Sequence, residues 1–200
     1  MATKRKVGNP LALAVLAYLS QRPMHPYELS RTLRENGDAR SIKFNHGSLY
    51  MVVQQLARAG FITEVETSRE GQRPERTVYG LTEAGRREQR DWLRELVGQP
   101  QHEYPQFVAA LSLIGALPPS EVLPLMRRRL DLLAGQQDEA RALIEGSLRQ
   151  GVPELFLIEE EYRLALIAAE VSFVRSLIER ITAPDGWGPM WAQFHGEPPP

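Results

Sequence analysis

One stretch, Phe44 to Leu81, constrains the fold of this chain most, because its hydrophobic pattern changes from helical to strand-like within a short distance. Four apolar residues recur at helical spacing and predict one buried helix face: Leu49, Val52, Val53 and Leu56. Two segments rich in β-branched and aromatic residues follow, at 61–67 and 76–81, and their connection contains Gly71 and Pro74. A helix followed by such a hairpin predicts the second half of a winged helix-turn-helix.

The opposite face of the predicted helix is polar and almost free of acid. At about 100° per residue this face presents four residues, with Ser48, Tyr50 and Gln55 at its edges: Gly47, Met51, Gln54 and Arg58. Helices that only face water usually mix Glu with Lys. The composition of this face therefore favours contact with the major groove of DNA.

Two helices are predicted ahead of this stretch. The segment Asn9 to Leu19 is nearly all apolar, which predicts a buried helix. Pro26 suits the first position of a second helix, which runs to about Glu35. The residues of this second helix expected to point inward are Tyr27, Leu29 and Leu33.

Local signals also mark where the later elements end and begin. Gly60 is expected to stop the helix that starts near His46 by adopting a left-handed conformation, with Phe61 packing back onto the last turn. Thr82 is expected to cap a further helix over 83–97.

From Tyr104 onward the pattern is helical only. A short apolar stripe comes first, at Phe107, Leu111, Ile114 and Leu117. Two longer stripes follow the alternating three- and four-residue steps typical of coiled-coil seams: Leu123, Met126, Leu130, Leu133, Gln137, Ala140 and Ile144, then Leu155, Ile158, Tyr162, Ala165, Ala169 and Phe173. Gly146 and residues 151–153 separate the stripes, which predicts an antiparallel hairpin of helices.

One such hairpin cannot cover its own apolar surface. Several apolar residues lie off the two predicted seams: Leu132, Leu143, Leu157, Leu164 and Ile167. A second copy of the chain, paired about a two-fold axis, would cover them. The sequence therefore predicts a homodimer.

Residues 183–200 hold five prolines and three glycines, which argue against a regular element. We expect a poorly ordered end that packs weakly on the helical domain. Because the segment also contains Trp187, Trp191 and Phe194, the alternative is a flap over an apolar cavity.

Composition excludes several classes of protein and indicates an anionic partner. The chain has no cysteine, so disulfide frameworks, cysteine-ligated zinc and cysteine nucleophiles are excluded, which fits a cytoplasmic protein. The longest apolar run, Leu11 to Leu19, is too short to span a bilayer, and no cleavage site follows it, so a buried helix is favoured over a signal peptide. Residues 1–90 carry a net charge of +6 and residues 91–200 a net charge of −7, which points to a polyanion contact on the N-terminal half, although +6 alone does not establish it.

No pattern of catalytic or metal-binding residues is visible. The histidines, His25, His46, His102 and His195, are scattered without metal-ligand spacing, and no Gly-rich phosphate loop is present. Glu159, Glu160 and Glu161 are interpreted as a solvated helix face. We therefore expect no enzymatic activity, no cofactor and no metal.

With these residues in view, the chain resembles the PadR family of bacterial transcriptional regulators. The segments that carry the resemblance are PYEL at 26–29, GSLY at 47–50, LARAGFI at 56–62, RTVYGLT at 76–82 and TEAGRREQRDWL at 82–93. The segment EYPQFVAALSL at 103–113 is similar to the larger, Vir-type members, which dimerise through a C-terminal helical domain. The chain departs from the family pattern at Pro26, where Gly is common, and at Met51, where Pro is common.

The resemblance implies a dimeric repressor of a palindromic operator, released from DNA in some members by small, frequently aromatic compounds. The expected fold is mainly α: a winged helix-turn-helix with three helices, a β-hairpin wing and a fourth helix over 1–98, then an all-α antiparallel dimerisation domain over 104–182 and the tail over 183–200. The partners implied are double-stranded DNA, a second copy and a small-molecule effector, with no membrane.

The predicted DNA site combines the helix and the wing. In the helix, the backbone N–H groups of Gly47 and Ser48 are expected to bind a phosphate, and the other candidate contacts are Asn45, His46, Tyr50, Gln54 and Arg58. Gln54 is suited to reading adenine, whereas Tyr50 has the alternative of packing on the second helix. In the wing, the candidates are Arg69, Gln72, Arg73 and Arg76, of which Arg73 best suits a narrow minor groove.

Two further sites are less specific. Lys4, Arg5 and Lys6 form a basic arm that could follow phosphates or simply be solvated. Trp92, Phe107 and Tyr162 are candidates for an effector cavity, although core packing is the alternative for Trp92. Two rival functions remain open: a winged-helix module that binds protein, which salt-insensitive binding would indicate, and a constitutive DNA binder that no metabolite releases.

Overall fold

The chain forms two compact units, an N-terminal unit, Met1–His102, and a C-terminal unit, Glu103–Pro200. A computed structural model describes residues 5–68, 76–196 and 198. Among these residues, no helix has the length and apolar character needed to cross a membrane. Each unit is described by itself.

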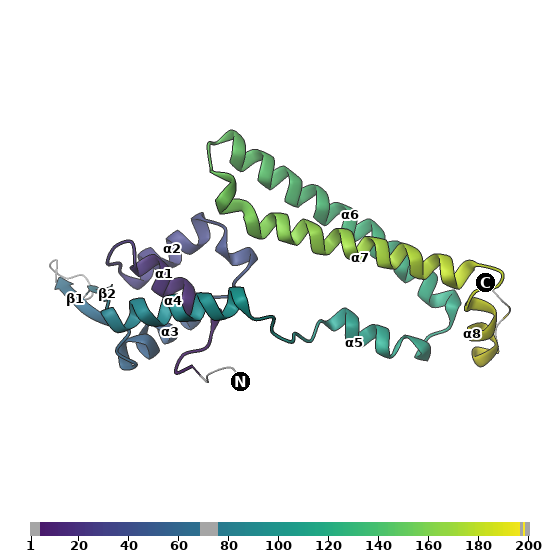
Figure 1. Ribbon diagram of the computed structural model, residues 1–200, viewed down its shortest axis with the longest axis horizontal. Helices are drawn as coiled ribbons and strands as arrows, with labels where there is room; N and C mark the ends of the chain where they lie inside the picture. Colours follow the sequence, from purple (N-terminus) through teal and green to yellow (C-terminus); the bar gives the residue numbers. More distant parts are fainter. Residues whose placement is uncertain (1–4, 69–75, 197, 199–200) are drawn as a thin grey trace. The chain divides into compact units, whose positions relative to one another are not determined.

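The N-terminal unit is a winged helix: helices surround an apolar core and an antiparallel hairpin extends from them (Figure 1). Its elements are α1 (Pro10–Leu19), α2 (Pro26–Glu35), the short 3₁₀ helix η1 (Asp38–Arg40), α3 (His46–Arg58), β1 (Ile62–Ser68), β2 (Arg76–Leu81) and α4 (Glu83–Gly98). The fold class predicted from the sequence is confirmed.

The core of this unit is built around α1, which is buried as predicted. Leu11, Val15 and Leu16 of α1 are fully buried and belong to one apolar cluster with Leu29, Leu33, Leu49, Leu56 and Trp92. The expectation that Tyr27 points inward is wrong, because its side chain is 61% exposed. The inward face of α2 is instead set by Pro26, Leu29, Ser30 and Leu33, and Tyr27 lies about 100° from Pro26 around the helix.

The end of α3 and the start of α4 follow the predicted local signals. Gly60 has a φ of 77°, and the N–H of Phe61 donates to the carbonyl of Leu56 at 3.0 Å, which closes the left-handed helix stop. Thr82 caps α4 by accepting from the N–H of Gly85 at 3.0 Å. Thr82 also donates its hydroxyl to the carbonyls of Gly60 at 2.8 Å and Phe61 at 2.9 Å, which links the start of α4 to the end of α3.

The hairpin pairs Ile62 with Leu81 at its base, and its register shifts by one residue between Glu64 and Glu66. A bulge of this kind strengthens the local twist of the strands. The segment before α2 also joins the hairpin, because Met24 and Tyr79 exchange backbone hydrogen bonds of 3.0 Å. The start of α2 is thereby fixed to the base of the wing.

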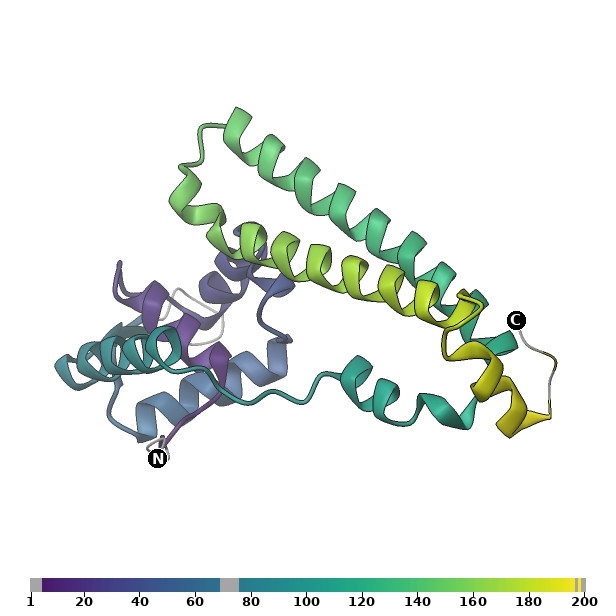
Figure 2. The same ribbon diagram turned by 45° about the vertical axis from the view of Figure 1, so that its right-hand side comes forward.

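The C-terminal unit is helical in its described residues. Its elements are α5 (Gln106–Ser112), the 3₁₀ helix η2 (Ile114–Ala116), α6 (Pro119–Arg149), the 3₁₀ helix η3 (Glu154–Leu157), α7 (Ile158–Thr182) and α8 (Gly188–His195). Helices α6 and α7 lie side by side as the predicted antiparallel hairpin (Figures 1 and 2). Gly146 does not separate the helices as expected, because α6 continues through it to Arg149.

The side of α7 that faces α6 differs from the prediction. The predicted α6 stripe is turned inward at Leu123, Met126, Leu133 and Ala140. The predicted α7 stripe is exposed instead, with Leu155, Ile158 and Tyr162 at 72, 61 and 66%. A second stripe at similar spacing is the buried one: Glu160, Ile167, Val174, Leu177 and Ile181. Because α7 is apolar on two sides, spacing alone could not choose between them.

The tail also differs from the prediction that residues 183–200 lack regular structure. Helix α8 begins with Pro189 in its first turn, where proline is tolerated, and ends at the left-handed Gly196. The indole N–H of Trp191 donates to the carbonyl of Leu117 at 3.0 Å, and Trp191 packs against the apolar cluster of this unit. The prolines and glycines thus border a helix rather than prevent one.

Candidate nucleic-acid interface

Helix α3 presents the two faces that its sequence predicts. Leu49, Val52, Val53 and Leu56 are buried in the core of the N-terminal unit. The opposite residues, Gly47, Met51, Gln54 and Arg58, are all exposed, and α3 contains no acidic residue. The outward face of α3 is therefore a polar and positively charged surface, and the buried face fixes the helix to the core.

A reciprocal capping box fixes the first turn of α3. The N–H of Ser48 donates to Oδ1 of Asn45 at 2.8 Å, and the N–H of Asn45 donates to Oγ of Ser48, also at 2.8 Å. The prediction that the N–H of Ser48 is free for a phosphate is therefore wrong, because the asparagine side chain occupies it. Two N–H groups, those of His46 and Gly47, precede the first intrahelical bond and take no part in the box.

Gly47 leaves this turn open to close approach. A Cβ added at Gly47 would meet only Oδ1 of Asn45, at an ordinary 3.5 Å, so the fold of the chain does not require glycine here. The bare backbone lies beside the N–H donors at the positive end of α3. This arrangement suits a phosphate oxygen that approaches the helix end closely.

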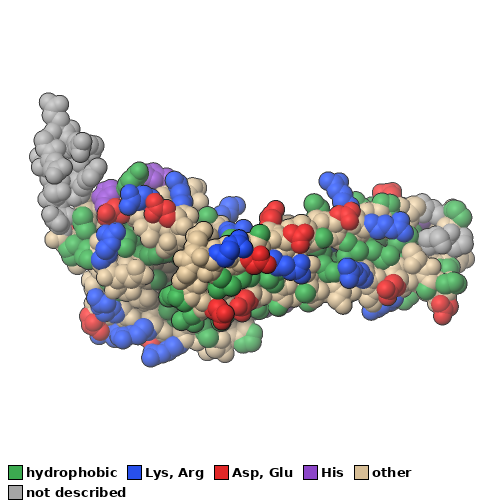
Figure 3. All heavy atoms as spheres, turned by 90° about the horizontal axis from the view of Figure 1, so that it is seen from above, with side chains coloured by type: hydrophobic (Ala, Val, Ile, Leu, Met, Phe, Trp, Pro, Cys, Tyr) green, Lys and Arg blue, Asp and Glu red, His purple; other side chains and the backbone are tan. Residues whose placement is uncertain are grey.

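Aromatic and basic groups flank the open turn. The rings of His46 and Tyr50 are in contact, with centroids 4.6 Å apart, one helical turn from each other. Tyr50 is half-buried. Histidine, lysine and arginine side chains gather, with a few carboxylates, at the end of the unit that carries the hairpin (Figure 3).

The predicted wing contacts lie at the edge of what the structure describes. Arg69, Gln72 and Arg73 fall outside the described residues, as does the side chain of Arg76, whose backbone begins β2 opposite Ser68. At the base of the wing, burial and the neighbouring carboxylate of Glu64 raise the pKa of Tyr79. Tyr79 is accordingly a neutral packing residue that fixes the origin of the hairpin.

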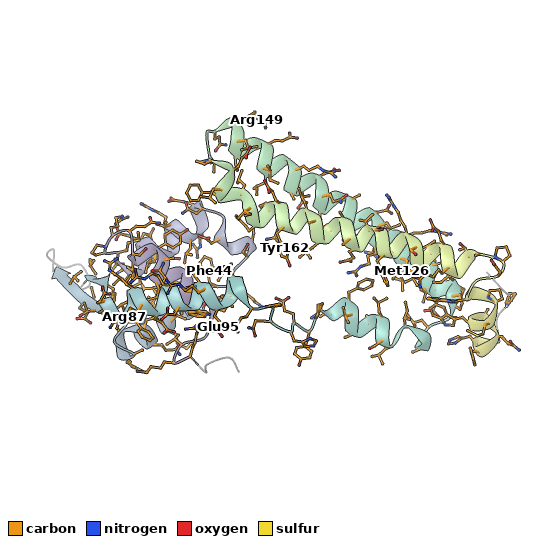
Figure 4. All side chains as sticks on the ribbon, in the orientation of Figure 1. Phe44, Arg87, Glu95, Met126, Arg149 and Tyr162 are labelled. Atoms are coloured by element: carbon orange, nitrogen blue, oxygen red, sulfur yellow. The ribbon has the colours of Figure 1, made fainter. Side chains whose placement is uncertain are left out.

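The basic arm at the N-terminus is not free in its described part. Arg5 donates to the carboxylate of Glu88 at 2.6 Å and to that of Glu95, and its guanidinium lies 5.3 Å from the ring centre of Trp92. Glu95 is marked on α4 in Figure 4. Arg5 is therefore a clamp that holds the start of the chain on α4. Lys4 lies outside the described residues, and Lys6 is exposed.

The predicted effector residues occupy different surroundings. Trp92 is 4% exposed and belongs to the core of the N-terminal unit. Phe107 of α5 packs under the guanidinium of Arg129, which lies 3.5 Å from its ring centre and pairs with Glu170 at 2.5 Å. Tyr162 is exposed on the side of α7 turned away from α6 (Figure 4). It lies about 12 Å along α7 from Glu170, at about 1.5 Å per residue, and so away from the Arg129–Glu170 pair that covers Phe107.

Two groups of residues near the interface were not singled out from the sequence. Tyr27, in the first turn of α2, is exposed, and α2 follows the bridge between Met24 and Tyr79. Tyr18, Asn36 and Asp38 form a hydrogen-bonded cluster at the connection between α2 and α3. The exposure of Tyr27 and the hydrogen bonds of Tyr18 both depend on tertiary packing, which residue spacing does not reveal.

Comparison with known proteins finds a family model that matches part of the chain. Residues 15–91 match the transcriptional regulator PadR-like family. A curated relative, the negative transcriptional regulator PadR of Bacillus subtilis (strain 168), is 25% identical over 147 residues, which cover 73% of this chain and 79% of the relative. The structure of B. subtilis PadR in complex with operator DNA has a TM-score of 0.67 and 22% identity, covering 86% of this chain and 97% of that one. The structure of the same protein in complex with p-coumaric acid has a TM-score of 0.66 and 19% identity, covering 89 and 97%.

Proposed function

We propose, on the premise that this chain belongs to the PadR-like family of transcriptional regulators, that it represses transcription by binding operator DNA through α3 and the wing. Membership of that family makes the chain a regulator and not an enzyme. The B. subtilis relative is a negative regulator, and its structure was solved with operator DNA, which supports repression as the mode of action. Acting on the chromosome, the protein would work in the cytoplasm.

One observation carries the proposal: the outward face of α3 is exposed, free of acid and rigidly mounted. Gln54 lies in the middle of this face, where a bidentate contact with adenine is geometrically natural. Arg58 lies one turn further on and suits the DNA backbone. The open turn at His46 and Gly47 supplies backbone donors for a phosphate, and Asn45 and Ser48 hold that turn in shape.

We also propose that the active form is a homodimer. The exposed stripe begins at Leu155 of η3 and continues along α7 in three- and four-residue steps, as a helix seam does, at Ile158, Tyr162, Ala165, Ala169 and Phe173. A two-fold axis that pairs this stripe with its copy would remove the apolar side chains from water. Two recognition helices related by that axis would read a palindromic operator.

The effector in this proposal is a small aromatic compound. The support is the relative whose structure contains p-coumaric acid. We assign its binding to the C-terminal unit, near Phe107 or Tyr162, because Trp92 is buried in the core of the N-terminal unit. Adding p-coumaric acid and related aromatic acids to the protein–DNA complex is expected to release labelled DNA. A complex that every acid in the series leaves intact would identify a constitutive DNA binder.

The deciding experiment measures fluorescence anisotropy of labelled duplexes at several salt concentrations. The DNA upstream of the chain's own gene is the first candidate operator, and a scrambled duplex of equal length is the control. We expect affinity to fall steeply as salt rises, because Lys and Arg displace counterions from phosphates. Absence of binding to any duplex in dilute buffer, together with salt-insensitive capture of a protein partner, would instead identify a protein-interaction module.

A further inference from the structure

The connection between α2 and α3 is tied to α1 through one hydroxyl group. Tyr18, in the last turn of α1, donates its hydroxyl to the carboxylate of Asp38. The same oxygen accepts a hydrogen bond of 2.9 Å from the side-chain amide of Asn36. Asn36 is the residue that ends α2, and Asp38 is the first residue of η1. The Tyr18 hydroxyl is therefore hydrogen-bonded to the residues on both sides of Gly37, just after the end of α2.

The backbone at this point turns sharply and is then held by its own hydrogen bonds. Gly37 adopts a φ of 77°, which glycine accepts without strain. The carbonyl of Asp38 accepts from the N–H groups of Ser41 at 3.0 Å and Ile42 at 2.8 Å. Asp38 thus links α1, through its carboxylate, to the backbone that leads toward Asn45, the N-cap of α3.

The ring and the hydroxyl of Tyr18 have separable roles. The ring packs against the core of the N-terminal unit, and a phenylalanine ring would occupy the same place. Only the hydroxyl reaches the connection. Burial, together with the bond to Asp38, raises the pKa of Tyr18 to about 12, so the hydroxyl keeps its proton and remains a donor throughout the physiological range.

We propose that Tyr18 is a positioning residue of the DNA site: its hydroxyl fixes the connection between α2 and α3 and thereby the pose of the first turn of α3. The inference rests on the proposed function, because the pose matters only if α3 reads DNA. Tyr18 itself touches neither base nor phosphate in this scheme. Base contacts depend on the placement of α3, whereas phosphate contacts by flexible cations tolerate small shifts.

The first test compares two duplexes and the variant Tyr18→Phe. One duplex is the sequence that the wild-type chain enriches from a random pool, and the other is a scrambled duplex of the same composition. The variant is expected to bind the enriched duplex roughly tenfold more weakly, the usual size of one lost base contact. Its affinity for the scrambled duplex and its salt slope should stay unchanged, because no phosphate contact is lost.

Substitutions at Asp38 provide matched controls from the other side of the bond. Asp38→Asn keeps an acceptor oxygen for the hydroxyl and should retain the wild-type preference, while Asp38→Ala should reproduce the loss seen with Tyr18→Phe. Equal loss of affinity for both duplexes would mark a merely structural role and overturn the proposal. An unchanged preference in both Tyr18→Phe and Asp38→Ala would overturn it as well.

The second test needs no DNA and separates this inference from the proposed function. Backbone amides of η1 and the first turn of α3 are expected to exchange with solvent faster in Tyr18→Phe, while those of the α1 core keep their rates. If the wild-type chain enriches no duplex, the proposed function fails, and this exchange pattern alone decides whether the hydroxyl positions α3. Unchanged exchange from Asp38 to Ser48 would refute the positioning role.

Discussion

Gly47 and Gly85 lie in the first turns of α3 and α4, but a methyl group would meet different surroundings at the two positions. At Gly85 it would overlap the carbonyl oxygen of Phe61, so the fold itself requires glycine there. At Gly47 it would meet a single oxygen at 3.5 Å. The fold therefore does not require glycine at position 47, and in the proposed function its bare backbone admits a phosphate.

Replacing Gly47 with alanine should separate DNA binding from stability. We expect Gly47→Ala to weaken DNA binding by about 1–2 kcal/mol, because the methyl group keeps a phosphate oxygen from the N–H donors. The free energy of unfolding should stay the same or rise by up to about 1 kcal/mol, as alanine favours helix. Anisotropy titration and urea unfolding measure the two quantities.

Two glycines serve as controls for that substitution. Gly135→Ala, within α6 and facing open space, should gain similar stability with unchanged DNA affinity. Gly85→Ala should lower the free energy of unfolding, because the backbone must move. If Gly47→Ala bound DNA as tightly as the wild type, close approach at this turn would be ruled out.

Gln54 and Arg58 should differ in what they contribute to binding. Gln54→Ala is expected to relax the base preference at one operator position, at a cost of about 1–3 kcal/mol for the preferred base. Arg58→Ala is expected to weaken binding to all sequences and to reduce the salt slope by about one. Arg141→Ala, an exposed arginine of α6, should change neither quantity. Binding-site selection and salt titration distinguish the outcomes.

Among single residues, those with local roles were predictable and those with tertiary roles were not. The stop at Gly60 and the cap at Thr82 follow from backbone geometry that a few neighbouring residues determine. The burial of Tyr27 was mispredicted, because the first turn of α2 extends beyond the core that covers Leu29 and Leu33. The bond from Tyr18 to Asp38 joins two elements and leaves no periodic mark in the sequence.

At the scale of whole elements, the hydrophobic pattern located the helices better than it assigned their faces. The buried face of α3 was predicted because only one side of that helix is apolar. Helix α7 has apolar residues on two sides, and the stripe that contains Val174 and Ile181 is the one packed on α6. Only the partner helix determines which of two such stripes is buried.

The link between α1 and the α2–α3 connection should depend on pH. Tyr18 has a folded pKa of about 12, above its ordinary value of 10.0, so folding favours the neutral hydroxyl. Its contribution to stability is present below pH 10.0 and is lost as the pH rises toward about 12. Urea unfolding across this range should therefore show a steeper loss of stability for the wild type than for Tyr18→Phe. Parallel curves for the two proteins would contradict this assignment.

For the whole molecule, the exposed stripe of α7 predicts an assembly of two chains. Ile158→Glu and Tyr162→Glu place a charge within that stripe and should shift the protein toward monomer, which sedimentation velocity measures directly. Binding to a palindromic duplex should weaken in parallel. Ala168→Glu, about 100° or more away around α7 from most of the stripe, is the matched control and should leave the mass unchanged. A monomeric wild type would remove the dimer from the proposed function.

Two features of the whole chain relate differently to its sequence. The sequence pattern changes from mixed to helical near Tyr104, and the chain divides into the units Met1–His102 and Glu103–Pro200, each with its own core. The helix within the tail was missed, because Trp191 is ordered by a bond to Leu117 and by packing on distant residues. Local composition shows the prolines and glycines of the tail, but it does not show the surface on which the tail packs.

Because Trp92 is buried, its fluorescence can report on the N-terminal unit separately from the C-terminal unit. It is the one tryptophan in the N-terminal unit, whereas Trp187 and Trp191 belong to the C-terminal unit. Substituting phenylalanine for the latter pair would leave a single indole emitting from the interior beneath Arg5. A red shift of that emission on heating would then report the thermal unfolding of the winged helix alone, independently of the helical hairpin.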